Sequence, residues 1–213
     1  MTLKRNNRNN SKTLVILMIT FIITVIAGTI KATETIKKQE MKNAFRNIYT
    51  IYSNTLVSTV ADMSGSTGCY YSDSGDSDLS NCDNFYRTFV NNMKIKKYCQ
   101  NNGLEQGCVG TYEKYTTDKR CSGFFERMIS KEDDIFLMEN GSSIIIFKAP
   151  NGSRTPFFAV DVNGPKGPNK AGEDLFSILL MRHNSGSYYF HSNISYCLPI
   201  DKGGIEYIQD IYK

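Results

Sequence analysis

Proline is missing from the whole of residues 1–149, because all five prolines of this 213-residue chain lie at or after Pro150. Inside a helix, proline removes a backbone hydrogen bond and clashes with the preceding turn. No residue of this kind therefore interrupts a helix in the first 149 residues. Tryptophan is absent as well, so the aromatic side chains are thirteen tyrosines and twelve phenylalanines.

Motifs for catalysis and zinc binding are also missing. The chain contains no G-x-S-x-G, no H-E-x-x-H and no phosphate-binding glycine loop. Its six cysteines include no C-x-x-C pair, and its two histidines, His183 and His191, are not spaced with any cysteine as a zinc ligand set. The sequence therefore predicts a protein that is not an enzyme, and it gives no support for a structural zinc site.

Positive charge is concentrated at the start of the chain. The formal net charge is +4, but residues 1–63 carry nine Lys and Arg against three Asp and Glu, whereas the remaining residues carry sixteen against eighteen. A nucleic-acid-binding domain normally presents an excess of basic side chains. The later part of the chain has none, so we expect no nucleic-acid partner.

An uncharged apolar run, TLVILMITFIITVIAGTI, occupies residues 13–30. Eighteen helical residues cover roughly 27 Å, close to the thickness of the hydrocarbon core of a bilayer. The run predicts an uncleaved transmembrane segment. The alternatives are a cleaved secretory signal, whose apolar part is usually shorter and for which Ala27 and Gly28 form a poor cleavage site, and a buried core helix.

The leader before this run, residues 1–12, contains Lys4, Arg5, Arg8 and Lys12 and no acidic residue. Basic residues next to a membrane span favour the cytoplasmic side. The sequence therefore predicts a single-pass protein of the cytoplasmic membrane with its N-terminus in the cytoplasm and everything after residue 30 exported.

The cysteines agree with this orientation, because every one of them lies in the exported part and their number is even. An oxidising compartment and up to three disulfides are expected. Six cysteines allow fifteen pairings, and the sequence does not choose among them. The pairing of Cys99 with Cys108, which closes a short loop, is the first that we expect. The candidates are Cys69, Cys82, Cys99, Cys108, Cys121 and Cys197.

Residues 31–63 continue the helical pattern with one apolar stripe. Its members recur every three or four residues and are Met41, Ala44, Phe45, Ile48, Tyr52, Leu56, Val60 and Met63. We expect one helix from about Lys12 to Met63, ended by the SGSTG run at 64–68. Residues 64–142 form a loop-rich, cysteine-containing region in which 85–98 and 121–129 could be short helices.

Residues 143–213 have the character of strands. The segments 143–149, 155–162, 174–181 and 187–192 are short, β-branched and aromatic, and turn residues separate them. Short connections favour an antiparallel sheet, and one face of that sheet could bury the helix stripe. The predicted fold class is α+β, with one long N-terminal helix packed on an antiparallel sheet and disulfide-bearing loops.

Two segments carry a resemblance to a known family. TLVILMI opens the apolar helix behind a basic leader, and DVNGPKGPNKAGEDLF at 161–176 is similar to a D-x-N-G…P-N…G-x-D-x-F segment of bacterial pilin-like proteins. The chain resembles a type IV pilin or a type II secretion pseudopilin. The resemblance implies a structural subunit that assembles through its N-terminal helix with other pilin-like subunits and an inner-membrane assembly platform, in a surface filament or pseudopilus.

The processing site departs from the family pattern, which is glycine, then phenylalanine, then T-L-V-E. The resemblance places the cleavage point between Ser11 and Lys12, where neither glycine nor phenylalanine is present, and puts Ile16 where the family has glutamate. A buried carboxylate in lipid needs a partner, and Ile16 cannot supply one half of such a pair. The chain then resembles either a minor or tip subunit or a relative that stays a plain membrane protein.

The assembly surface implied by the resemblance is the apolar stripe of the helix, represented by Ile16, Phe45, Ile48 and Tyr52. Neighbouring spans would replace lipid contacts along this stripe. The alternative function is a membrane-anchored extracytoplasmic receptor or adhesin that has pilin-like architecture and does not assemble.

The 161–176 segment also offers oxygen ligands. Asp161, Asn163, Asn169 and Asp174 could bind calcium, which takes about six to eight oxygens. The other interpretation is that these side chains brace a turn through hydrogen bonds to the backbone. No cofactor is required by the sequence, and calcium is the one metal that it suggests.

Overall fold

The computed structural model describes residues 6–100, 102–111, 134–148, 154–167, 169 and 174–192. The chain divides into two compact units, Met1–Glu40 and Met41–Lys213. The short helix predicted at 121–129 lies outside the described residues.

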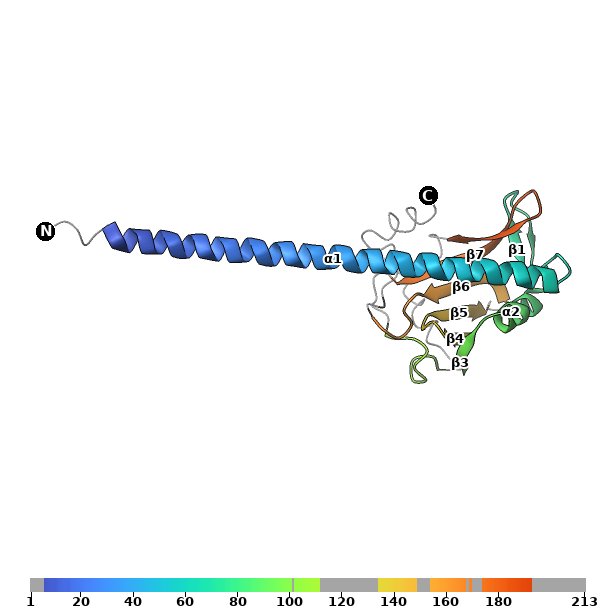
Figure 1. Cartoon of the computed structure of the whole chain (residues 1–213). Helices are drawn as coiled ribbons and strands as arrows, with labels where there is room; N and C mark the ends of the chain where they lie inside the picture. Colours follow the sequence, from blue (N-terminus) through green and yellow to red (C-terminus); the bar gives the residue numbers. More distant parts are fainter. Residues whose placement is uncertain are drawn as a thin grey trace, which may run out of the picture. The chain divides into compact units, whose positions relative to one another are not determined.

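Helix α1 spans Asn6–Asp62 and contributes residues to both units (Figure 1). The long helix expected from the sequence is confirmed. It is continuous because no proline interrupts it. It ends where the backbone turns left-handed at Ser64 (φ 58°) and Gly65 (φ 90°). The Gly65 amide donates a 2.8 Å hydrogen bond back to the Val60 carbonyl, which satisfies one of the last carbonyls of the helix.

The second unit contains one further described helix and eight described strands, with the following bounds: β1 (Tyr70–Ser72), β2 (Ser77–Asp78), α2 (Cys82–Asn91), β3 (Ile95–Gln100), β4 (Asp134–Met138), β5 (Ser143–Lys148), β6 (Arg154–Asp161), β7 (Leu175–Arg182) and β8 (Tyr188–Ser192). The four strands predicted after residue 142 are confirmed as β5 to β8 to within about a residue at each end. Four more strands, β1 to β4, lie within residues 64–142, for which the sequence predicted only a loop-rich region.

The strands form one mixed sheet in the order β2-β1-β7-β6-β5-β4-β3, and β8 pairs with β7 (Figure 1). Consecutive strands from β3 to β8 pair antiparallel, as expected for strands joined in sequence. Strand β1 pairs parallel with β7, through Tyr71 with Met181 and Ser72 with Arg182. The prediction of a purely antiparallel sheet is therefore wrong for β1, because this strand reaches the sheet from a distant part of the chain.

Alternate residues of the central strands are buried on opposite faces of the sheet. In β5, Ile144 and Ile146 belong to one hydrophobic cluster and Ile145 to another, and each is fully buried. Side chains alternate between the two faces because the period of a strand is two residues. Burial on both faces explains why these strands are continuous apolar runs.

The stripe of α1 within the second unit packs on the first of these faces. Phe45, Ile48, Tyr52 and Leu56 share a cluster with β5, β6, β7 and the apolar side of α2. The sequence prediction that one face of the sheet buries this stripe is confirmed. The opposite face carries the smaller cluster, which includes the buried Cys99–Cys108 pair and Val109.

Helix α2 differs from the helix expected at 85–98. It begins at Cys82 and ends at Asn91, with Phe85, Tyr86 and Phe89 on its buried face. The last residues of the predicted helix instead belong to β3, which pairs antiparallel with β4. The pairing of β3 with β4, a strand distant in sequence, cannot be predicted from a local helical pattern.

Candidate functional site

The first unit presents an exposed apolar surface. The large hydrophobic residues between Leu14 and Ile30 are each between 48% and 70% exposed. Among the described residues, α1 is the one helix long and apolar enough to cross a membrane, with a mean hydropathy of 2.6 in its best window. The long apolar N-terminal helix indicates a membrane anchor.

Threonine hydroxyls within this apolar segment are satisfied by the helix itself. Thr20 donates to the Leu17 carbonyl at 2.9 Å, and Thr24 donates to the Phe21 carbonyl at 2.8 Å. A hydroxyl that bonds to the preceding turn leaves no unsatisfied donor facing lipid. The threonines are therefore compatible with a membrane span.

The residues expected to mark the assembly surface lie in different environments. Ile16 is 61% exposed, whereas Phe45, Ile48 and Tyr52 are at most 3% exposed and packed in the core of the second unit. These three side chains are occupied by contacts within the chain. The described apolar surface open to a neighbouring helix is therefore that of residues 14–30, which contains Ile16.

The phenol of Tyr52 is an unusual feature of this core. The side chain is completely buried, and the buried Ser142 is the polar side chain beside its hydroxyl. Burial, which penalises the charged form, raises the pKa of Tyr52 well above its usual range. The group stays neutral, and it serves the packing of α1 against Phe89 and Phe158, whose ring centroids each lie 6.1 Å away.

The two predicted processing residues are part of α1. Ser11 and Lys12 lie within its first turns rather than in a separate extended leader.

The loop between β6 and β7 brings together the four predicted metal ligands. Asp161 is the last residue of β6, and Asp174 directly precedes β7; both carboxylates are completely buried. The amide of Val162 donates a 2.8 Å hydrogen bond to the Asp174 carbonyl, so the two ends of the loop are adjacent.

Hydrogen bonds from the loop backbone hold both carboxylates. The Asn163 amide donates to Oδ1 of Asp161 at 3.2 Å, and the Asn169 amide donates to Oδ2 of Asp174 at 2.6 Å. The side chain of Asn163 in turn donates to the Gly167 carbonyl at 2.9 Å. These contacts are those expected of side chains that brace a turn.

Two amide oxygens in the same loop remain unsatisfied. The Oδ1 atoms of Asn163 and Asn169 are buried, and neither has a hydrogen-bond partner among the described residues. Asn169 also holds a left-handed backbone, with φ at 55°. Unpaired buried oxygens next to two buried carboxylates form a donor set of the kind that calcium prefers.

A metal centre built from charged or soft ligands is not found in the described part of the chain, where no three His, Cys, Asp or Glu side chains gather. Any cation in the β6–β7 loop would depend on the two carboxylates and on neutral oxygens. Such a ligand set suits calcium rather than zinc.

Two disulfides are present among the described cysteines, Cys69–Cys82 and Cys99–Cys108. The second pairing is the one first expected from the sequence, and it is confirmed. Cys121 and Cys197 lie outside the described residues. Disulfides of this kind indicate an oxidising compartment, and therefore an extracytoplasmic location for the second unit.

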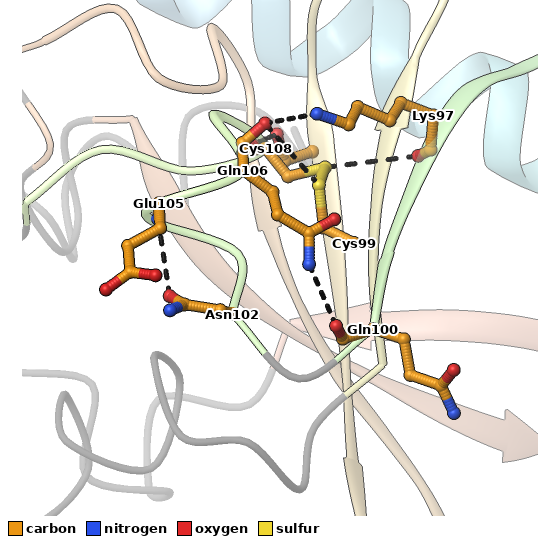
Figure 2. Close-up of a disulfide and its surroundings, with 8 residues drawn as sticks. Lys97, Cys99, Gln100, Asn102, Glu105, Gln106 and Cys108 are labelled. Carbon is orange, nitrogen blue, oxygen red and sulfur yellow. Dashed lines mark hydrogen bonds between the residues drawn. A yellow bond between two sulfur atoms is a disulfide. The ribbon is translucent and has the colours of Figure 1, made fainter.

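The short loop closed by Cys99 and Cys108 is held by its own polar groups (Figure 2). Lys97 Nζ donates to the Gln106 carbonyl at 2.5 Å, and Gln106 Nε2 donates to the Gln100 carbonyl at 2.9 Å. Both cysteines are completely buried. The loop is therefore a well-defined element at the edge of the sheet, although it has no regular secondary structure.

A polar cluster that the sequence does not predict joins the β1–β2 turn to the β7–β8 hairpin. Asp73 Oδ2 lies 2.9 Å from Nδ1 of His183, and the Tyr189 hydroxyl donates to Asp73 Oδ1 at 2.7 Å. The rings of His183 and Tyr189 stack at a centroid distance of 3.9 Å. Asp73 and His183 are 110 positions apart, so no local pattern in the sequence could have found this cluster.

A second group of aromatic side chains lies beside it. The guanidinium carbon of Arg182 is 5.2 Å from the ring centroid of Tyr70 and 5.8 Å from that of Tyr188. Both distances are within the range of a cation–π contact. The arrangement of these tyrosines around Arg182 is a result of the tertiary fold, because Tyr70 and Arg182 are 112 positions apart.

Comparison with known proteins finds no matching family model, no matching curated protein and no matching solved structure. Functional conclusions therefore rest on the residues and contacts described above.

Proposed function

We propose that this chain is a membrane-anchored, pilin-like structural subunit of a bacterial type IV pilus or type II secretion system, in the role of a minor pilin or pseudopilin. It assembles through its N-terminal helix with other pilin-like subunits and engages an inner-membrane assembly platform. Its N-terminus lies in the cytoplasm and its second unit outside, at the membrane or in a surface filament.

The observation that carries the proposal is that two parts of α1 lie in different environments, one exposed and one in the core. One helix, Asn6–Asp62, presents exposed apolar side chains in residues 14–30 and supplies Phe45 and Tyr52 to the core of the second unit. A simple anchor has no need to continue as a core element of the exported domain. In the pilin-like family that the chain resembles, one helix serves both purposes, and neighbouring spans replace its lipid contacts in the assembly.

The apolar surface supports lateral contact with other helices. Ile16 and its neighbours carry no charge, and the threonine hydroxyls of the segment are satisfied within the helix. Neighbouring helices can therefore replace lipid without leaving a polar group unpaired. Ile16 cannot form the carboxylate pair of the family that the chain resembles, which favours a minor or tip position over a major subunit.

The N-terminus of the native protein tests the proposal directly. Intact mass and N-terminal sequencing of protein purified from native membranes distinguish a start at Met1 from a start at Lys12. A processed start supports entry into a filament. An unprocessed start in the whole population would weigh heavily against assembly and leave a plain membrane protein.

Release with filaments gives an independent test. Cells are sheared, and the released fraction and the membranes are probed for the protein, with an unrelated single-pass inner-membrane protein as the control for lysis. A filament subunit leaves with the sheared fraction, whereas the control stays in the membrane. Retention of all the protein in the membrane would favour the alternative function.

The alternative is a membrane-anchored receptor or adhesin that does not assemble. The polar cluster of Asp73, His183 and Tyr189 is the observation that favours it, because His183 is 47% exposed and stacks on an aromatic ring at the surface. Substitution of His183 by alanine should then reduce ligand or surface binding without changing the amount of protein in the sheared fraction.

We also propose that the β6–β7 loop is the place where calcium would bind. The buried Asp161 and Asp174 carboxylates and the unpaired Oδ1 atoms of Asn163 and Asn169 support this proposal. Assembly through the N-terminal helix does not require calcium binding at this loop.

A further inference from the structure

The chain that leaves the Cys99–Cys108 disulfide is attached to the sheet by a buried serine. Ser143 Oγ, at the start of β5, donates a short hydrogen bond to the Cys108 carbonyl. Both residues are completely buried. The position of Cys108 is thus fixed by two connections: the covalent bond to Cys99 on β3 and the hydrogen bond to β5.

The same serine contacts the β6–β7 loop. Ser143 is the register partner of Asp161, with which that loop begins. A Cβ placed on Gly164 would lie 3.1 Å from Ser143 Oγ and would collide with the Gly141 carbonyl, so Gly164 packs directly on this part of β5. Ser143 therefore lies between the disulfide loop and the β6–β7 loop and contacts both of them.

A second contact joins the two loops two residues beyond the disulfide. Gly110 packs against the side chain of Asn169, and a Cβ on Gly110 would lie 2.7 Å from the Asn169 Cγ and closer still to Nδ2. Real Cβ atoms do not approach so closely, so a side chain at position 110 requires Asn169 to move. Asn169 is also the residue whose amide bonds to Asp174 and whose backbone is left-handed.

The other disulfide has different surroundings. Cys69 and Cys82 join the segment after α1 to the start of α2, where the Asn81 amide donates to the Gly68 carbonyl at 2.8 Å. They belong to the hydrophobic cluster on the α1 face of the sheet, whereas Cys99 and Cys108 belong to the cluster on the opposite face. Cys69–Cys82 therefore provides a matched control within the same chain.

We infer that the Cys99–Cys108 disulfide positions the β6–β7 loop, through Ser143 on one side and the Gly110–Asn169 contact on the other. The disulfide holds residues 108–110 against the sheet, and residues 108–110 hold the loop in the conformation in which Asn163 and Asn169 donate to the two buried carboxylates. The coupling is a property of the fold and does not depend on calcium or on filament assembly.

Hydrogen exchange on the full chain in detergent micelles measures this coupling. The amides of Asn163 and Asn169 are followed in Cys99→Ala/Cys108→Ala and in Cys69→Ala/Cys82→Ala, with the amide of Ile178 in β7 reporting global opening. Loss of one or two buried hydrogen bonds, each about 1 kcal/mol, corresponds to roughly five- to thirtyfold faster local exchange. We expect this increase, beyond the change at Ile178, only in the first variant.

Glycine substitutions test the same coupling with both disulfides intact, and they decide the matter if a cysteine variant does not fold. Gly110→Ala should accelerate exchange at both Asn163 and Asn169, whereas Gly167→Ala should not, because a Cβ on Gly167 meets Asn169 only at ordinary distances of 3.8 Å or more. In an Asn169→Gly background the space is open, so Gly110→Ala should then leave exchange at Asn163 unchanged.

Two results would overturn the inference. One is an equal increase in the exchange rate of the loop amides in the two cysteine variants, after the change in exchange at the Ile178 amide has been subtracted as global opening. The other is a Gly110→Ala variant whose loop exchanges at the rate of the unsubstituted protein, or whose effect on Asn163 is the same with and without the Asn169 side chain.

Discussion

Phe45 of α1 and Phe176 of β7 lie with their ring centroids 4.4 Å apart, and both side chains are buried. The contact joins the helix to the central part of the sheet. Phe45, Ile48, Tyr52 and Leu56 of α1 are therefore part of the hydrophobic core of the second unit.

Substitution of Phe45 by alanine should destabilise the second unit by about 3–5 kcal/mol, because a large buried ring is replaced by a cavity. The change is measured by denaturant unfolding of the full chain in detergent, followed by the near-ultraviolet circular dichroism of its tyrosines. Val57→Ala is the control on the same helix, since Val57 is 70% exposed and its loss should change stability by less than about 0.5 kcal/mol. Equal effects of the two substitutions would contradict the packing of α1 described above.

The ionisation of Tyr189 should depend on Asp73. Burial, and next the hydrogen bond to Asp73, raise the pKa of Tyr189 to about 12. A raised pKa means that the neutral phenol is favoured in the folded state, so this stabilisation is present below pH 10 and is lost as the pH rises through about 12. Asp73→Asn should lower the pKa of Tyr189, as measured by ultraviolet absorbance titration or NMR of the Tyr189 ring. A phenol that titrates at the same pH in both proteins would contradict the contact.

Asp73 itself should titrate below its usual range. The hydrogen bond from Tyr189, and next that with His183, lower its pKa. A depressed pKa means that the carboxylate is favoured in the folded state, so its contribution is present above the unfolded value of 3.8 and is lost as the pH falls through the folded value. NMR titration of the Asp73 carboxyl carbon should show a rise toward 3.8 in Tyr189→Phe, whereas Ser185→Ala, which changes a different hydroxyl of the β7–β8 turn, should have no such effect.

Thiol titration tests the predicted redox compartment. The protein is purified from its native membranes, denatured without a reducing agent and treated with an alkylating reagent. If the exported part matures under oxidising conditions, none of the six cysteines should be labelled. Peptide mapping should recover Cys69–Cys82 and Cys99–Cys108 as linked peptides. Labelling of Cys121 and Cys197 would show instead that only two disulfides form.

Calcium should raise the melting temperature of the protein if the β6–β7 loop binds it. At a concentration one hundred times the dissociation constant, a ligand adds about 2.7 kcal/mol of stability, or roughly 5–10 °C for a domain of this size. Asp161→Asn should abolish the shift, while Asp76→Asn, an exposed residue of the β1–β2 hairpin, should keep it. No shift in saturating calcium would leave bracing as the sole role of the loop's carboxylates.

Much of the fold follows from local patterns. The apolar run at 13–30, the stripe with a period of three to four residues and the absence of proline were enough to predict α1 as one helix. Short β-branched and aromatic segments separated by turn residues predicted β5 to β8. These features are readable because each depends on side chains only a few positions apart.

The candidate site was predicted only in part. The pairing of Cys99 with Cys108 was predicted from the sequence and is confirmed. The calcium site proposed for Asp161, Asn163, Asn169 and Asp174 stays a prediction. The cluster of Asp73, His183 and Tyr189 was missed, because its members come from two hairpins that meet only in the folded chain. The Gly110–Asn169 contact was missed for the same reason.

The sequence by itself determined that the chain has an uncharged segment long enough to span a membrane, that a single helix continues from it, and that strands follow. Only the tertiary structure decided which apolar side chains remain exposed: Ile16 does, whereas Phe45, Ile48 and Tyr52 are buried. It also decided that β1 joins the sheet in parallel beside β7 and that the sheet is buried on both faces. The physical reason is that local propensity and periodicity depend on neighbours in the chain, whereas burial and strand order depend on contacts between distant segments, which form only when the whole chain closes around its core.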